Sequence, residues 1–185
     1  QILNAKYPAD LSLRVKSPFH SLYLEALFKE FPDTQLVTIH RDPKDVLESW
    51  LSFIARMSVP TFREKSFTME EFAESQIQFL ERSGEVMASF LQGADNQGLA
   101  NHLPLSFSRF VSNPVGTVEN VYDFFKMPSL TATDRERMKA LLTQKETQKT
   151  LLPKFKIEEL GISKEEIEKR FSSYHQSFGH LYQTT

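Results

Sequence analysis

An alternating run of apolar and polar positions and a second, mainly apolar run near the start of the chain predict two short strands joined by a helix. Apolar residues alternate with polar ones from Leu11 to Val15, and a second apolar run occupies Gln35 to Ile39. Between them, Pro18 to Phe31 repeats its apolar positions at helical spacing, and another helix is expected from Pro43 to about Met57. Because a helix joins the two strands, we expect them to pair in parallel.

The rest of the chain predicts mainly helices, with one more strand from Leu103 to Phe107. Thr68 and Glu71 form a capping box ahead of a long amphipathic stretch that ends near Leu91. Three more helices are expected where a capping residue precedes apolar positions, at Asn113, Thr133 and Ser163. Residues 58–67, 92–101 and 144–156 lack any period and are expected to be loops.

Composition limits the class of protein. The chain contains no repeat and no linker, so we expect a single α/β domain over residues 1–185, with a short parallel sheet flanked by many helices. A net charge of −2 gives no bulk attraction to nucleic acid or to a membrane surface. The absence of cysteine excludes disulfides, thiolate metal sites and a cysteine nucleophile. No apolar run approaches the length of a membrane span.

Two strand-to-helix turns carry the same arrangement of residue types. Lys16-Ser17-Pro18 and Arg41-Asp42-Pro43 each place a basic residue, a capping residue and a proline in that order. The capping side chain accepts from free N–H groups of the first helical turn, and proline suits a position whose N–H would be unpaired. A cation beside a helix N-terminus favours an anion, above all a phosphate. We therefore expect Lys16 and Arg41 to leave adjacent parallel strands at one edge of the sheet, where α/β proteins bind ligands.

The same residues resemble a known family. The runs VKSPFH and FPDTQLVTIHRDPKDVLES are similar to sulfotransferases that use 3′-phosphoadenosine 5′-phosphosulfate (PAPS), in the branch with KSPxH and HRDP motifs. The run SFSRFVSNPVGTVENVYDFF and the tail GISKEEIEKRFSSY also resemble segments of that family. The resemblance covers most of the chain. It implies a P-loop-like sulfotransferase fold, of which these residues form the C-terminal part.

The resemblance implies roles for particular residues. Arg41 and Ser49 match the arginine and serine that hold the 3′-phosphate of the donor, Lys16 matches a lysine near the transferring sulfuryl group, and His20 matches a candidate base. An imidazole with an ordinary pKa near 6.5 suits proton abstraction at neutral pH. From the residues alone, His20 is equally a half-buried histidine on the margin of a helix. His40 is expected to pack or to orient Arg41 rather than to react.

Three further positions match donor contacts of the family more loosely. Phe107 stands where relatives have a tyrosine close to the adenine, although a strand phenylalanine more often packs in a core. Lys154 and Lys156 fall in a basic loop where relatives place further 3′-phosphate contacts. No metal is expected, because no histidine pair or carboxylate cluster has ligand spacing.

One feature of the family is missing from the sequence. Its loop for the 5′-phosphosulfate lies ahead of the KSP segment, but the residues before Lys16 contain no glycine-rich or basic loop, and the Walker pattern is absent. We therefore expect the fold to be incomplete at its N-terminus, where the sequence starts at Gln1. We also expect little or no turnover by this chain alone. The alternative is a non-catalytic binding module that keeps only the 3′-phosphate pocket. A small-molecule kinase fits less well, since it needs the Walker lysine and a magnesium carboxylate.

The acceptor stays open. The resemblance implies a hydroxyl or amine on a small molecule or a glycan, with no nucleic acid as partner. The sequence does not fix the oligomeric state. It also leaves the compartment open between the cytoplasm and, with an anchor upstream, the Golgi lumen.

Overall fold

The computed structural model describes residues 14–58, 68–93, 99–147 and 156–182. In these residues the sheet has two parallel strands, β1 (Leu36–His40) and β2 (His102–Ser106). Their register pairs Leu36 with His102 and His40 with Ser106. The α/β architecture with a short parallel sheet is thereby confirmed, and two of the three expected strands appear within one residue of their predicted bounds.

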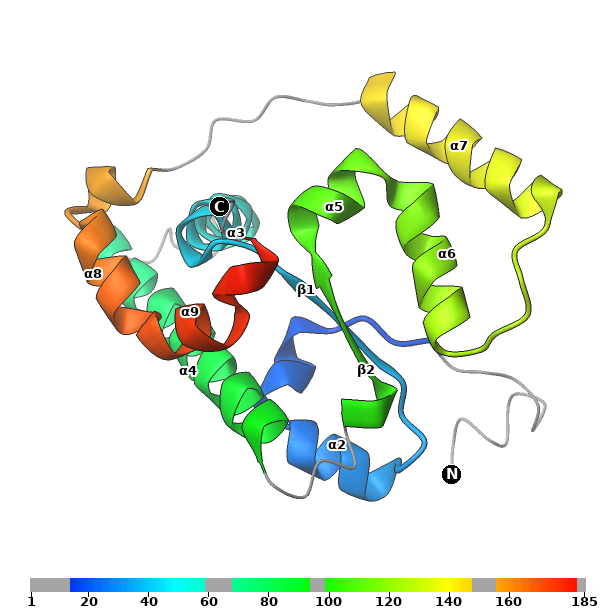
Figure 1. Cartoon of the computed structure of the whole chain (residues 1–185). Helices are drawn as coiled ribbons and strands as arrows, with labels where there is room; N and C mark the ends of the chain where they lie inside the picture. Colours follow the sequence, from blue (N-terminus) through cyan, green and yellow to red (C-terminus); the bar gives the residue numbers. More distant parts are fainter. Residues whose placement is uncertain (1–13, 59–67, 94–98, 148–155, 183–185) are drawn as a thin grey trace.

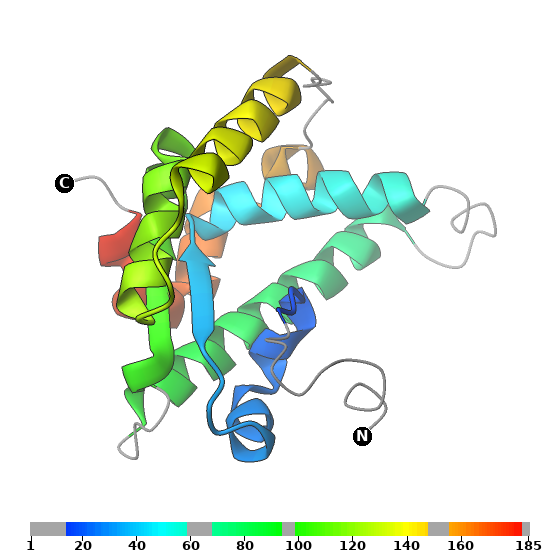
Figure 2. The same cartoon turned by 90° about the vertical axis from the view of Figure 1, so that its right-hand side faces the viewer.

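Helices make up most of the rest. They are η1 (Pro18–Leu22), α2 (Leu24–Glu30), α3 (Pro43–Ser58), α4 (Met69–Gln92), η2 (Leu99–Asn101), α5 (Phe107–Ser112), α6 (Pro114–Phe124), α7 (Ala132–Thr147), η3 (Ile157–Leu160), α8 (Lys164–Arg170), α9 (Ser172–Phe178) and η4 (Gly179–Leu181), where η is a 3-10 helix. One side of the sheet faces α4, α8 and α9, and α6 lies on the other side, with α7 packed against α6 (Figures 1 and 2). Buried side chains lie mainly on the side of α4 and α9, since α6 has no buried residue and Val37 and Ile39 of β1 are exposed.

Capping residues set most of the helix starts that the sequence predicts. The Thr68 hydroxyl accepts from the Glu71 N–H at 3.1 Å, and the Glu71 carboxylate accepts from the Thr68 N–H at 2.8 Å, so the capping box is confirmed. Asn113 and Ser163 also cap their helices through side-chain oxygens. The predicted cap at Thr133 is wrong by two residues. Thr131 forms the reciprocal pair with Asp134 instead.

The structure corrects the first predicted strand. Arg14 and Val15 are not in a strand, and Leu11 to Leu13 lie outside the described residues. The Arg14 guanidinium donates to the Tyr122 hydroxyl at 3.2 Å and lies 5.6 Å from the centroid of its ring. This contact places Arg14 beside α6, and among the described residues β1 pairs with β2.

Three other expectations about helices change. The helix expected from Pro18 to Phe31 is interrupted at Tyr23, where a 3-10 turn ends and α2 begins. The last helix is interrupted at Phe171, whose side chain enters the core. The sequence did not indicate α5, which starts at Phe107, the last residue of the strand that we expected there.

The core lies where α3, α4, η3 and α8 meet. Its buried members are Leu47, Leu51, Ala73, Ile77, Ile157, Ile167 and Phe171. Leu47 and Leu51 are one turn apart on α3, which is why the apolar positions of that helix predict its buried face. The core thus packs against the helix that follows β1, and it holds that helix in place.

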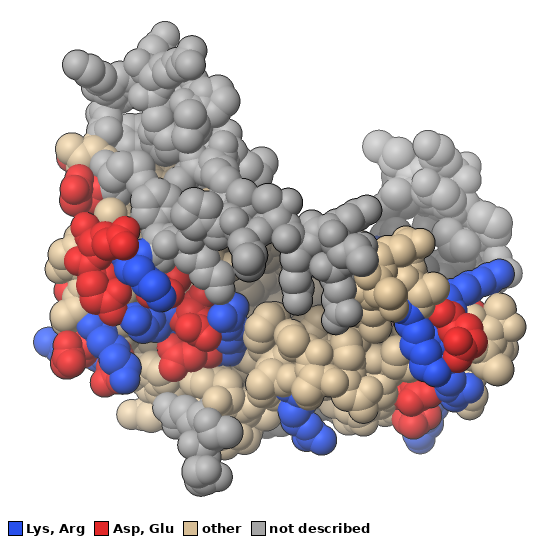
Figure 3. Space-filling view, turned by 90° about the horizontal axis from the view of Figure 1, so that it is seen from above, with Lys and Arg blue, Asp and Glu red and all other residues tan. Residues whose placement is uncertain are grey.

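Charges on the described surface are mixed. Viewed from above Figure 1, basic and acidic side chains intermingle on the side of α8 and on the side of α7, with an uncharged area between them (Figure 3). This face therefore has no broad region of one sign, as the small net charge leads one to expect. None of the helices in the described ranges is long and apolar enough to cross a membrane.

Packing around Leu47 gives a direct test of the core. Leu47 is fully buried, whereas Leu141 on α7 is 58% exposed. We expect Leu47→Ala to lower the free energy of unfolding by about 2–5 kcal/mol, because it removes buried methyl groups and leaves a cavity. Leu141→Ala, the same substitution at an exposed site, should change it by less than about 0.5 kcal/mol. Urea denaturation measures both values, and equal losses would contradict this assignment of the core.

Candidate functional site

The C-terminal ends of the two strands bring two predicted site residues together. Arg41 follows His40, the last residue of β1, and Phe107 follows Ser106, the last residue of β2. His40 and Ser106 are register partners, so the residues after them leave the same edge of the sheet. The Arg41 guanidinium lies 4.6 Å from the centroid of the Phe107 ring, which is cation–π geometry. A planar cation and an aromatic face are thus neighbours at this edge.

The Arg41 side chain is bound by a carboxylate. Its Nε and Nη2 atoms donate to Asp45 Oδ2 at 3.1 and 2.9 Å. Ser49 lies four residues beyond Asp45 on α3 and is exposed, so the two side chains share one face of the helix. Asp42, between Arg41 and the helix, caps α3 by accepting from the Lys44 N–H at 2.9 Å. Arg41, Asp45 and Ser49 therefore form a row that starts at the sheet edge.

Lys156, the residue before η3, lies against the face of α3 that carries Glu48. Its Nζ is 3.3 Å from Glu48 Oε2, and Glu48 is buried, with Lys44 Nζ at 3.5 Å from its other oxygen. A hydrogen bond with Glu158 raises the pKa of Lys44, and the same contact lowers the pKa of Glu158. These ion pairs fix η3 to α3 and keep one predicted lysine next to the row of Arg41. Lys154 lies outside the described residues.

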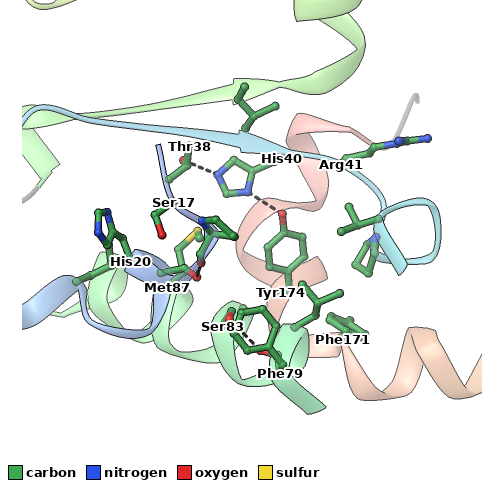
Figure 4. A pocket seen from close by; sticks show the side chains of 18 of the residues that line it. Ser17, His20, Thr38, His40, Arg41, Phe79, Ser83, Met87, Phe171 and Tyr174 are labelled. Carbon is green, nitrogen blue, oxygen red and sulfur yellow. Dashed lines mark hydrogen bonds between the residues drawn. The ribbon is translucent and has the colours of Figure 1, made fainter. Parts of the chain in front are cut away.

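His20 borders a cavity beside β1. The cavity has a volume of about 310 Å³, and six successive residues, 36–41, line it, so the edge of the strand forms one wall. The other walls come from η1, α4 and the C-terminal helices, and most of their side chains are apolar. His20 lies on one side of this cavity, and Arg41 lies on the other with its side chain directed away (Figure 4).

In the described residues Lys16 does not follow a strand that pairs with β1. It is exposed and stands just before η1, where Ser17 caps the turn by accepting from the Phe19 N–H at 3.3 Å. That cap was predicted, but the segment before it is not a strand adjacent to β1. The shared edge expected for Lys16 and Arg41 is therefore replaced by an edge shared between Arg41 and Phe107.

His40 is the most constrained polar residue near the site. It is 1% exposed, and its ring stacks on Phe178 with centroids 4.2 Å apart. Its Nε2 lies 2.7 Å from Thr38 Oγ1, and its Nδ1 lies 2.9 Å from the Tyr174 hydroxyl. Thr38 Oγ1 is also 2.7 Å from His102 Nε2, so four side chains form one hydrogen-bonded chain. As expected, His40 packs in the interior.

Burial controls the protonation of these hydrogen-bonded side chains. It lowers the pKa of His40 to about 4, with smaller contributions from His102 and His180. Burial also lowers the pKa of His102 and raises the pKa of Tyr174. At neutral pH the four hydrogen-bonded side chains are therefore uncharged, and the positive charge at the sheet edge belongs to Arg41.

Two residues at the site escaped the sequence analysis. Asp45 lies four residues after Arg41, and this spacing is typical of an ion pair on a helix, so the sequence did carry a local signal for it. Tyr174 belongs to the RFSSY tail, but it lies 134 positions from His40 in the sequence, so no local signal indicated their contact.

In the described part of the chain no three His, Cys, Asp or Glu side chains gather as metal ligands would. What the sheet edge offers is a fork of N–H donors, an aromatic face and a hydroxyl, groups that suit a phosphate carried by a planar ring system.

The low pKa of His40 predicts that acid destabilises the fold. Between pH 6.5 and pH 4 the unfolded chain binds a proton at this residue and the folded chain does not, so stability falls as pH falls. The loss attributable to His40 is about 3 kcal/mol over that range, at about 1.4 kcal/mol per pH unit. Urea denaturation at several pH values should show a smaller decline for His40→Gln. The exposed control His20→Gln should keep the wild-type decline, and an unchanged decline in His40→Gln would contradict the prediction.

Comparison with known proteins places the chain in a family. Residues 2–132 match the model of the sulfotransferase family, a range that includes both strands, Arg41, Ser49 and Phe107. No match was found among curated proteins, and none among solved structures. The matched range covers more than half of the chain and agrees with the helix-rich α/β fold. The chain therefore belongs to the sulfotransferase family.

Proposed function

We propose that the chain takes part in sulfuryl transfer from PAPS to a hydroxyl or amine of a small molecule or glycan. The observation that carries this proposal is the Arg41 guanidinium stacked on Phe107 at the C-terminal edge of the sheet. Family membership supports the reaction class. The donor is an adenine nucleotide with a 3′-phosphate, so a cation beside an aromatic ring fits both of its recognisable parts.

In this proposal the row on α3 holds the 3′-phosphate. The planar fork of Arg41 donates to two phosphate oxygens, and the Ser49 hydroxyl donates to a third. Phe107 offers a face for the adenine, and Lys156 adds positive charge from the next face of α3. Binding requires Arg41 to exchange its contact with Asp45 for the phosphate. Both partners are partly exposed, with side chains 26% and 51% accessible, so the exchange needs no rearrangement of the core.

The chemical step is assigned to the side of the cavity where His20 lies. His20 takes the proton of the acceptor as the acceptor oxygen or nitrogen bonds to sulfur. The bond from sulfur to the 5′-phosphate oxygen breaks, and adenosine 3′,5′-bisphosphate leaves. Lys16 neutralises negative charge on the sulfuryl oxygens. Such a reaction depends mainly on positioning and on charge neutralisation.

A non-catalytic binding module is the second candidate. The exposed position of Lys16 favours it, since no strand of the described structure holds this residue beside β1. The two functions share the nucleotide site and differ only in turnover, so the same protein can be tested for both.

Nucleotide binding is tested first. Adenosine 3′,5′-bisphosphate should bind with heat that calorimetry detects, and Arg41→Ala should weaken binding by about 1.5–3 kcal/mol through loss of a charge-assisted contact. Asp45→Asn should strengthen binding, because it removes a negative charge that competes for the guanidinium. The matched controls are Arg82→Ala and Glu85→Gln, which alter an exposed ion pair of the same kind on α4. If Arg41→Ala binds as wild type does, the proposed site is wrong.

Turnover separates the enzyme from the binding module. With labelled PAPS and a panel of phenols, alcohols and amines, His20→Ala should lower kcat by about 10²–10⁴-fold if His20 is the base. Phe19→Ala, an exposed neighbour on η1, is the control for local disturbance. Bisphosphate binding without any turnover would favour the binding module. Turnover that survives His20→Ala would remove this residue from the chemistry.

A further inference from the structure

The C-terminal arm, by which we mean α8 and α9 together (residues 164–178), has no part in the proposed function. It lies beyond the residues that match the family model, which end at 132. Nevertheless it crosses α4 and ends beside the C-terminal end of β1 (Figure 1). Its RFSSY segment supplies three side chains with distinct contacts, from Arg170, Phe171 and Tyr174.

Arg170 anchors the arm to α4. Its Nη1 and Nη2 donate to the two carboxylate oxygens of Glu74 at 2.7 and 3.0 Å, and its Nε and Nη2 donate to Glu81 at 3.0 and 2.8 Å. The guanidinium is only 18% exposed, and its hydrogen bonds lower the pKa of Glu74. Forked, partly buried pairs of this kind fix geometry better than exposed single contacts do.

Phe171 and Gly84 set the approach of the next turn. Phe171 is 5% exposed and packs in the core with Leu47 and Leu51 of α3. A Cβ atom at Gly84 would lie 3.2 Å from Tyr174 Cδ2, so the glycine lets the tyrosine ring lie close against α4. The arm thereby carries the Tyr174 hydroxyl to a defined point in the interior.

That point is His40, one residue before Arg41. The Tyr174 hydroxyl occupies one ring nitrogen of His40 at 2.9 Å, and Thr38 occupies the other at 2.7 Å (Figure 4). Burial raises the pKa of Tyr174, while an interaction with the Arg41 backbone opposes that rise. Because the imidazole is buried and neutral, loss of the tyrosine hydroxyl would leave a ring nitrogen without a partner in the interior.

We propose that Tyr174 is a positioning residue for Arg41. Its hydroxyl fixes the His40 ring, and the fixed ring holds the turn from β1 into α3 in the conformation that presents the guanidinium beside Phe107. The arm therefore connects the anchor on α4 to the phosphate site. The consequence for ligand binding rests on the proposed function. The consequence for the Arg41 side chain in the ligand-free protein does not.

Tyr174→Phe tests the proposal, because it removes the hydroxyl and keeps the ring. The NMR signal of the Arg41 Nε–Hε group, identified by its loss in Arg41→Ala, reports the side chain without any ligand. We expect this signal to shift or broaden in Tyr174→Phe. Binding of adenosine 3′,5′-bisphosphate should weaken about 2- to 30-fold, the range for coupling through packed contacts. In an Arg41→Ala background Tyr174→Phe should have no further effect on binding, which a general loss of structure would not produce.

The matched control is Tyr182→Phe. Tyr182 lies near the arm and stacks on Tyr174, but its hydroxyl pairs with His175 at 2.8 Å and not with His40. It should leave the Arg41 signal unchanged. If Tyr174→Phe does not fold, Thr38→Val removes the contact at the other ring nitrogen and should shift the same signal.

The outcomes are distinguishable. An unchanged Arg41 signal in a folded Tyr174→Phe or Thr38→Val protein overturns the positioning role, whatever the ligand does. If the Arg41 signal changes in these variants but the wild-type protein does not bind the bisphosphate, the positioning role is supported and the proposed function is overturned.

Discussion

The parallel pairing of β1 with β2 is the constraint on which the candidate site depends. Parallel strands end at one edge, so the register between His40 and Ser106 makes Arg41 and Phe107 neighbours although they are 66 positions apart in the sequence. The helices that follow also start at that edge, and α3 carries Asp45 and Ser49 away from it. The core beneath α3 then fixes this row, since Leu47 and Leu51 are buried on the opposite side of the helix.

The inner face of the sheet creates a second requirement. Thr38, His40 and His102 are all buried, and each polar atom there needs a partner. Neighbouring side chains within the sheet supply two contacts, and Tyr174 supplies one from α9. Apolar residues of similar size would be easier to bury. These hydrogen-bonded side chains link the last helices to the turn before Arg41. We therefore interpret them as fixing orientation rather than as adding stability.

Local sequence signals predicted much of this structure. Capping pairs such as Thr68 with Glu71 identify helix starts because the interaction lies within one turn, and short runs rich in apolar residues located β1 and β2. Alternation from Leu11 to Val15 misled, because the described part of that run is not in a strand. The failures arise where distant contacts decide. Arg14, expected in a strand, contacts Tyr122 of α6, and Phe171 is buried in the core at the point where the last helix is interrupted. At the site, Arg41 and Ser49 had a family motif, whereas Tyr174 became visible only when the fold brought it to His40.

The balance of charges at Arg41 decides whether a phosphate can bind there. An exposed pair such as that with Asp45 contributes about 0–1 kcal/mol, because water screens both partners and two side chains lose freedom. A charge-assisted contact with a phosphate contributes about 1.5–3 kcal/mol. If the phosphate binds as we propose, these magnitudes favour its displacing the carboxylate, which in the ligand-free protein keeps the guanidinium oriented toward α3. In the proposed positioning role His40 contributes orientation and no charge, because its lowered pKa keeps the imidazole neutral at physiological pH. In the proposed site Arg41 is the cation that meets the phosphate directly, and the contacts with Asp45 and Phe107 determine where its guanidinium points.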